Sequence, residues 1–525
     1  MDGSVATCSL IHWYIGLVPK SLPLLLLALA AAPVRAQCPD CTPAPCRTRA
    51  AGPAGNSVAV LYFDNLSRDS SDAYLAEGLT EELITRLGDI PRLTVKSRYA
   101  VRRYRGETDV DPAAIGRTLS VAYLVTGSVQ RAGEVLRVRC ELARATTGNR
   151  VWGQEYERGD GDILAVTTDI ARRVATGVAG RLLPGERAVL DARPTQNPGA
   201  YRDLVSGDVL LARRTPASVR SAIAEYQAAT RLDPNLVAAW ARIGLAYAIW
   251  LDWGWSDDGL VPPDSFLVAG VAAAARALAL DSLSSDAWLA WGYLQIFAHP
   301  RDFAGAEAGM RRAVALNPRN AEAWSQLGDL LGYLQRDSEM AEPMRRALAI
   351  EPGRPITLLN LGAIAAPPLA LALLDSAIAI EPGFHNAYRV RARTKYLLHD
   401  TAGARADFAT YAGLAPPGTE WIARADRVGA LRALGDTAEA TALARRMRAE
   451  LPATGRIAIR VGSSLAPALV AIGDTAGALD VVERMQPGAL LWQFLFKNVN
   501  LRDPALPPRV RELMDESRPP WAVHR

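Results

Sequence analysis

One short phrase returns at intervals through the middle of the chain. It ends a run of small and apolar residues with Leu or Ile, then an acidic or amide residue and usually Pro. The acidic or amide members are Asp233, Asp281, Asn317, Glu351 and Glu381, which lie 48, 36, 34 and 30 residues apart. Pro cannot continue a helix, so each phrase ends one helix. A period in the mid-thirties predicts stacked helical hairpins.

A second pattern follows each phrase and predicts how the helices pack. An aromatic or large apolar residue is followed three positions later by an apolar residue and then by Gly or Ala, as in Trp288, Trp291 and Gly292. Such spacings place side chains on one helical face, where the small residue admits a neighbouring helix. The pattern returns at Trp240/Ile243/Gly244, Trp324/Leu327/Gly328, Leu358/Leu361/Gly362 and, in degenerate form, Tyr388/Arg391/Ala392.

These positions resemble the tetratricopeptide repeat (TPR), in which antiparallel helix pairs stack into a superhelix. The resemblance predicts repeats over residues 198–398. Three similar inter-helix loops predict degenerate helical repeats over 399–487. Residues 488–525 are predicted to form a cap and a tail.

The resemblance also implies a binding surface. First helices of stacked repeats line a concave groove, which is the usual site for a partner peptide. By position in the pattern, the groove-facing candidates are Arg242, Tyr293, Gln326, Asp329, Asn360, Arg389 and Arg393. Their mixed charges favour a polar peptide or a C-terminal peptide as the ligand.

Two tryptophans in the long second interval are further candidates for partner contact. Trp253 and Trp255 flank Gly254 and precede Asp257, which predicts a partly open loop. Tryptophan is enriched at interface hot spots. Aromatic residues at helical spacing are more often core residues, so packing is the alternative interpretation. Trp250 and the other repeat aromatics are predicted to pack in the core.

The first 36 residues predict export. Lys20 precedes the apolar run 22–32, and Val34 and Ala36 are small residues at positions that a signal peptidase favours. The run is shorter than the ~20 apolar residues of a membrane-spanning helix. Residues 1–36 are therefore predicted to be a signal peptide or a short uncleaved anchor, which would be the chain's only membrane attachment. The predicted location is periplasmic or secreted.

Residues 37–56 are predicted to be a Cys- and Pro-rich linker. Cys38, Cys41 and Cys46 lie in it, and neither a His nor a fourth Cys is nearby. In an exported chain this spacing favours disulfide chemistry over a metal site, and the pairing stays open.

Residues 57–185 have a different sequence pattern, which predicts both strands and helices. The continuous apolar run 58–63 predicts a buried strand, and the order of elements that follows is β-α-β-α-β-β-β-α. Cys140 is predicted to pack within a strand. The predicted fold class is an α+β domain, with helices packed on a mixed sheet, followed by an all-α TPR solenoid.

This domain resembles the TolB-amino-terminal-like domain. The matching segments are 58–67, 74–83, 115–119 and 123–129. The family is often joined to TPRs in bacteria, sometimes behind a kinase, a cyclase or a DNA-binding head. Only about 20 residues separate the predicted signal from the first strand, too few for a head domain.

The sequence lacks the common catalytic and nucleotide-binding motifs. It contains no phosphate-binding loop, zinc-protease, serine-hydrolase or kinase signature. The five histidines are scattered. Glu77, Glu81 and Glu82 share one predicted helix and are expected to face water. No enzyme activity, cofactor or metal is predicted.

The basic residues give little support for a nucleic-acid partner, since 59 basic and 55 acidic residues leave a net charge of +4. The segment 96–105 interleaves arginines with tyrosines and is predicted to be a solvated loop. The alternative is a patch for an anionic ligand, which the joint substitution of Arg102, Arg103 and Arg105 would test.

The function predicted from these patterns is binding. The chain is expected to be a non-enzymatic protein–protein interaction scaffold of the bacterial cell envelope, with a protein or peptide partner in the TPR groove. The alternative is a sensory module whose sheet domain binds a small molecule or an envelope component and relays binding through the repeats.

Overall fold

The computed structural model describes residues 54–69, 72–106, 111–133, 135–159, 163–253, 255, 264–298, 302–334, 336–414, 420–452, 454–457, 459–485, 508 and 512. The predicted signal segment and the three cysteines of the predicted linker lie outside these residues, as does the predicted cap apart from residues 508 and 512. No helix in the described ranges is long and apolar enough to cross a membrane.

The N-terminal part is built on a mixed sheet, as predicted. The strand order is β3-β1-β4-β5-β6, and β2 pairs with β4 outside this path. Strand β1 runs parallel to β3 and β4, whereas β4, β5 and β6 form an antiparallel meander. The strands are β1 Ser57–Val60, β2 Asp64–Asn65, β3 Thr94–Val95, β4 Tyr123–Ala132, β5 Val135–Arg144 and β6 Arg150–Gly159.

Helices cover both faces of this sheet. Leucines of α1 (Ala73–Gly88) and apolar residues of α4 (Ile163–Ala179) pack with Val58 and Val60. Helix α3 (Pro112–Leu119) packs with Ala59 on the opposite face. The run 58–60 is apolar at every position because β1 is buried on both faces. Cys140 is buried in β5, as predicted.

Helix α4 ends at Ala179, because Gly180 adopts a left-handed backbone with φ of 74°. Pro184 begins α5 (Pro184–Asp191), at the first helical turn that tolerates it. The predicted loop at 96–105 contains the short helix α2 (Arg98–Val101) and a 3-10 turn, η2 (Arg102–Tyr104).

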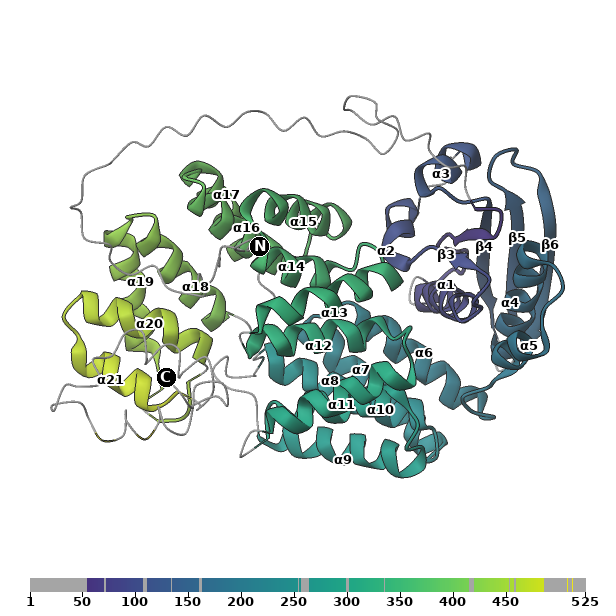
Figure 1. Cartoon of the computed structure of the whole chain (residues 1–525). Helices are drawn as coiled ribbons and strands as arrows, with labels where there is room; N and C mark the ends of the chain where they lie inside the picture. The colour runs from purple at the N-terminus through teal and green to yellow at the C-terminus, as the bar shows by residue number, and fades with distance from the viewer. Residues whose placement is uncertain are drawn as a thin grey trace, which may run out of the picture. The chain divides into compact units, whose positions relative to one another are not determined.

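From Pro198 onward the described chain consists of helices that pack in antiparallel pairs (Figure 1). The two helices of each pair contact one another, and successive pairs stack, as the TPR resemblance predicts. The pairs are α6 (Pro198–Ala212) with α7 (Pro216–Leu232), α8 (Val237–Trp253) with α9 (Asp264–Leu280), α10 (Ser285–Gln295) with α11 (Phe303–Leu316), α12 (Ala321–Tyr333) with α13 (Asp337–Ile350), α14 (Pro355–Ile364) with α15 (Pro367–Ile380), α16 (His385–Leu397) with α17 (Thr401–Leu414), α18 (Glu420–Ala433) with α19 (Thr437–Glu450), and α20 (Ile459–Ala471) with α21 (Thr475–Glu483).

The recurring aromatic has the same contact in several repeats. The indole N–H of Trp240, Trp288 and Trp324 donates to the carbonyl six residues earlier, at 2.8 to 3.0 Å. The hydroxyl of Tyr388 makes the equivalent bond to Pro382 at 3.1 Å. Each aromatic therefore closes the turn that joins one repeat to the next. This contact explains the constant spacing between the aromatic and the recurring acidic or amide residue with its Pro.

The recurring glycine sets how closely helices approach. A Cβ at Gly292 would lie 2.9 Å from the carbonyl oxygen of Ala306 and 3.0 Å from the amide nitrogen of Met310. Both atoms belong to the backbone of α11, the partner helix of α10. The small residue is thus required by contact between two helix backbones, as the pattern predicts.

Candidate functional site

A cleft of about 980 Å³ opens where the first helices of the repeats face α1 and α2. The repeats contribute the turn between α6 and α7 and residues at or near the start of α10, α12, α14 and α16. Arginines and acidic residues are mixed in the lining, which also holds Trp253 close to Phe384 and His385. The charged lining residues include Arg98, Arg102, Arg214, Arg242, Arg319, Arg354, Asp208, Asp286, Glu322, Glu351 and Glu381.

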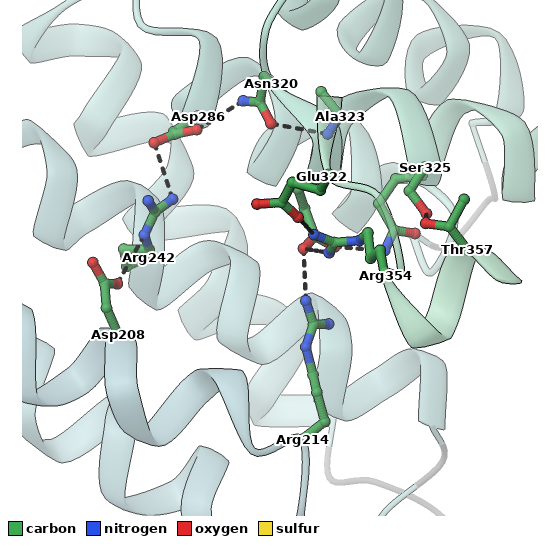
Figure 2. Close-up of polar contacts among 12 residues, drawn as sticks. Asp208, Arg214, Arg242, Asp286, Asn320, Glu322, Ala323, Ser325, Arg354 and Thr357 are labelled. Carbon is green, nitrogen blue, oxygen red and sulfur yellow. Dashed lines mark hydrogen bonds and ion pairs between the residues drawn. The ribbon is translucent and has the colours of Figure 1, made fainter. Parts of the chain in front are cut away.

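One wall of the cleft is a polar ladder across four consecutive first helices (Figure 2). Arg242 of α8 lies between Asp208 of α6, at 3.0 Å, and Asp286 of α10, at 2.9 Å. The amide of Asn320, which caps α12, donates to Asp286 at 2.9 Å. Asp286 and Asp208 hold the pKa of Arg242 above its usual value. The ladder fixes the relative positions of these helices.

A second polar cluster of the cleft lining centres on Glu322 at the start of α12. Arg214 contacts this carboxylate at 2.7 Å, and Arg354 of the α13–α14 turn also donates to it. Burial alone would raise the pKa of Glu322, but the charges of Arg214 and Arg354 together lower it well below its usual value. The ionised carboxylate is therefore strongly preferred.

Arg214 reaches Glu322 from a strained turn. Its φ of 50° lies in the left-handed region, which costs free energy for a residue with a Cβ. Figure 2 shows its side chain extending from this turn towards Glu322. The two residues are 108 positions apart, so this contact joins the first repeat to the fourth.

The arginine-rich segment closes part of the cleft. Arg98 contacts Glu81 at 2.9 Å and Glu351 at 3.5 Å, and Arg102 contacts Glu381 at 3.2 Å. The segment is therefore not the predicted solvated loop, because arginines one helical turn apart meet acidic residues from two successive repeat turns. The neighbouring Ser97 hydroxyl donates to the carbonyl of Pro352 at 2.7 Å.

The glutamates of α1 were expected to face water, and the structure corrects this. Glu77 contacts Arg105 at 2.8 Å, and Glu82 contacts Arg86 at 2.6 Å. Glu81 accepts from Tyr62 at 2.5 Å and pairs with Arg98. Arginine side chains of the sheet domain therefore form ion pairs with all three of these carboxylates.

Of the seven predicted groove residues, Arg242 lines the cleft and the other six lie outside its lining. Arg242 lines the cleft as part of the polar ladder. Gln326 is 5% exposed and donates to Glu322 at 2.9 Å, so it supports the cluster around Glu322. Tyr293, Asp329 and Asn360 lie together on α10, α12 and α14, where the Asn360 amide donates to Asp329 at 3.0 Å. Their role in partner binding remains a prediction.

The two remaining groove candidates lie farther along the array, on α16. Arg389 approaches Asp426 of α18 at 3.7 Å, and its side chain is 11% exposed. Burial lowers the pKa of Arg393. Both arginines therefore sit at the junction between α16 and α18.

The two loop tryptophans differ from the predicted open loop. Trp255 is 1% exposed, and its ring packs edge-on against Trp250 at 5.5 Å between centroids. Trp253 is half-buried and lines the cleft, where its ring lies 6.4 Å from those of Phe384 and His385. Aromatic packing across repeats removes apolar surface from water, which explains this burial.

Several lining residues were missed by the sequence analysis. Asp286, Asn320, Glu322 and Arg354 all lie two to four positions before the pattern aromatic or its Leu equivalent. Residues two or four positions before this aromatic line the cleft at α10, α12 and α14, so these positions were a usable signal. The described residues contain no cluster of His, Cys, Asp and Glu suited to a metal ion.

Comparisons with known proteins give partial matches. No family model matches the chain. A putative adenylate cyclase 3 of Rhizobium meliloti (strain 1021) is 33% identical over 193 residues, which are 37% of this chain. The chain spans about a third (33%) of that relative's length.

The comparison with solved structures found partial likenesses. Pseudomonas aeruginosa pilF is 18% identical, with a TM-score of 0.32, over 42% of this chain and 94% of that one. A thermophilic TPR protein of Thermus thermophilus is 15% identical, with a TM-score of 0.30, over 38% and 99%. A monomeric IFIT1 mutant with m7Gppp-AAAA is 12% identical, with a TM-score of 0.41, over 62% and 86%. Because these TM-scores are low, the fold is assigned from the helix pairs described above and not from these likenesses.

Proposed function

We propose that this chain is a non-enzymatic interaction scaffold of the bacterial cell envelope, which binds a protein partner in the cleft. The observation that carries this proposal is the cleft of about 980 Å³ along the first helices of the repeats. Its walls are built from ion pairs that already hold their geometry, such as Asp208–Arg242–Asp286. A preorganised surface loses little conformational entropy when a partner binds.

The charge pattern of the cleft favours an extended polar peptide. Positive and negative side chains are mixed in the lining, and Trp253, Phe384 and His385 add an aromatic surface. A peptide with mixed charges and one apolar anchor would complement both parts.

The envelope location is supported by the export pattern in residues 1–36 and by the resemblance of 57–185 to the TolB-amino-terminal-like domain. Protease digestion of intact and of osmotically opened cells would test it. The chain is expected to become accessible once the outer envelope is opened, while a cytoplasmic control protein stays intact. Protection of the chain together with that control would contradict the location.

The adenylate cyclase match makes catalysis the first alternative to exclude. The match covers only a third (33%) of that relative, so its activity does not transfer to this chain. We expect the purified chain to form no cyclic AMP from ATP with magnesium or manganese, and measured turnover would contradict a non-enzymatic role.

Crosslinking with mass spectrometry in cells tests the scaffold directly. The proposal expects one dominant partner whose cross-links map to residues around the cleft. Cross-links spread evenly over the outer second helices would contradict it.

A sensory role is the second candidate, and the contacts of α2 favour it. Arg98 and Arg102 join the sheet domain to the turns after α13 and α15, so a ligand that shifts α2 would shift these turns. A saturable thermal shift with a small envelope molecule would support this role. If that shift persists after Arg98→Ala and Arg102→Ala, the relay through α2 is wrong.

A further inference from the structure

The recurring acidic or amide residue of the repeat turns has two different roles along the array. At the first three turns it is Asp233, Asp281 or Asn317, and its side chain accepts a hydrogen bond from the backbone amide two residues later, at 2.9 to 3.0 Å. Such a bond stabilises the turn itself. At the last two turns the residue is Glu351 or Glu381. Their longer side chains make no such bond to the described backbone, so both carboxylates are available to other residues.

These two glutamates are the residues that the sheet domain contacts. Arg98 lies 3.5 Å from Glu351, and Arg102 lies 3.2 Å from Glu381. The two arginines are four positions apart in the helical turn formed by α2 and η2, so they project from the same side. The two glutamates hold equivalent positions in successive repeats. Two arginines at helical spacing therefore match two glutamates at repeat spacing.

The contacts between α2 and the repeats can open at little cost. The four side chains are between 21% and 35% exposed, and ion pairs accessible to water contribute little to stability. Arg98 also contacts Glu81 at 2.9 Å, and Glu351 also contacts Arg354 at 2.5 Å. When Arg98 and Glu351 separate, each of them therefore keeps another partner of opposite charge.

Helix α2 is attached to the sheet domain by apolar contacts that do not involve its arginines. Val101 is 0% exposed and packs with Ala59 and Leu61 in the core of that domain. The arginine side chains can therefore leave the repeat turns by rotating, while the backbone of α2 keeps its place in the sheet domain.

We propose that Glu351 and Glu381 form a docking site for two arginines one helical turn apart, and that the arginines of α2 hold this site until a partner segment with the same spacing displaces them. The inference deepens the proposed function and rests on it. Arg98, Arg102 and both glutamates line the cleft, so a partner bound there meets them. One helical turn within an otherwise extended partner segment is enough, because α2 itself has only four residues.

Glu381 is the position that decides the exchange. Among the described residues it forms one ion pair, with Arg102, and Arg102 has no second acidic partner there. Departure of Arg102 therefore leaves a carboxylate that a partner arginine can bind through two parallel hydrogen bonds. The neighbouring Arg103 is exposed and forms no ion pair with a described carboxylate, which makes it a matched control.

The test measures binding of a labelled peptide to the full chain by fluorescence anisotropy at low ionic strength, where charge interactions are least screened. The probe is a capped 13-residue alanine peptide with arginines at its fifth and ninth positions, and the control peptide has them at its fifth and seventh. Arg102→Ala should strengthen binding of the probe about threefold, because it vacates Glu381. Arg103→Ala removes an equal charge and should leave binding unchanged.

Two further readouts separate the docking site from general charge attraction. In the Arg102→Ala chain, adding Glu381→Gln should abolish the gain. Adding Glu342→Gln instead, at a site 55% exposed on α13 outside the cleft lining, should preserve it. The control peptide should bind every chain more weakly than the probe.

Equal affinities of the Arg102→Ala and Arg103→Ala chains for the probe would overturn the docking site. Equal binding of the two peptides, or no saturable binding of the probe to Arg102→Ala, would overturn it as well. Cross-links from the cleft to a protein partner do not depend on these results, so the scaffold is decided separately.

Discussion

Two carboxylates of α12 affect the free energy of unfolding in opposite directions, because only one of them has arginine neighbours. Glu322 is surrounded by arginines, whereas Asp329 on the same helix is not. The first arrangement favours the folded, ionised state, and the second disfavours it. The same helix therefore offers two tests of the charge assignments.

Glu322→Gln is expected to lower the free energy of unfolding by about 3 kcal/mol near pH 7, since two arginines lose their partner in a largely buried site. The lowered pKa of Glu322 means that its contribution is present above the unfolded-state pKa and is lost as pH falls. Urea denaturation at pH 7 and pH 3.5 measures the difference. An unchanged midpoint at pH 7 would show that the arginines are not held by this carboxylate.

Asp329→Asn should have the opposite effect. Burial, followed by the charge of Asp252, raises the pKa of Asp329 to about 7. The folded state therefore binds a proton more tightly than the unfolded state, so ionisation lowers stability as pH rises from about 4 to about 7. The variant should be more stable than the wild type by roughly 1–2 kcal/mol at pH 8 and equal to it at pH 4. Destabilisation at pH 8 would contradict the absence of a neighbouring cation.

At the scale of elements, stacking depends on close contact between helix backbones. Gly292→Ala should destabilise the protein by about 2 kcal/mol, because its Cβ would meet the backbone of α11. The control is Gly413→Ala in α17, where a Cβ meets no atom within 4 Å. This control should be neutral or slightly stabilising. Thermal unfolding distinguishes them, and equal effects would contradict the contact.

The local sequence pattern predicted the helices of the repeats. The features that it did not predict depend on contacts between residues far apart in the sequence. The Trp288 and Gly292 spacing lies within one helix, so the sequence shows it directly. The four-residue helix α2 is too short for periodicity and is positioned by contacts with distant turns. Likewise, the pairing of Arg214 with Glu322 spans 108 residues, which no local pattern encodes. The cleft wall was therefore predicted only in part.

At the scale of the whole molecule, contacts that skip repeats join distant parts of the chain. Trp253 of α8 meets Phe384 before α16, and α2 of the sheet domain meets two repeat turns. A simple solenoid has contacts only between neighbouring repeats. These longer contacts give the cleft a second wall, and each surface ion pair contributes at most about 1 kcal/mol.

Charge reversal of Arg98 and Arg102 together should loosen this second wall. Amide hydrogen exchange is expected to rise in the turns 350–354 and 380–384, while the helical circular dichroism stays unchanged. Exchange should rise less when Glu351 and Glu381 are reversed as well, because the pairs re-form with opposite polarity. Unchanged exchange in the first variant would contradict docking of α2 on these turns.

Site-specific photo-crosslinking in cells tests the central claim, that the cleft binds a protein partner. A photoreactive amino acid replaces Arg319, an exposed residue of the cleft wall, or Arg345, which is 66% exposed on α13 outside the cleft. The account predicts one defined protein adduct from position 319 and none of that size from position 345. Equal adducts from both positions, or none from position 319, would contradict it.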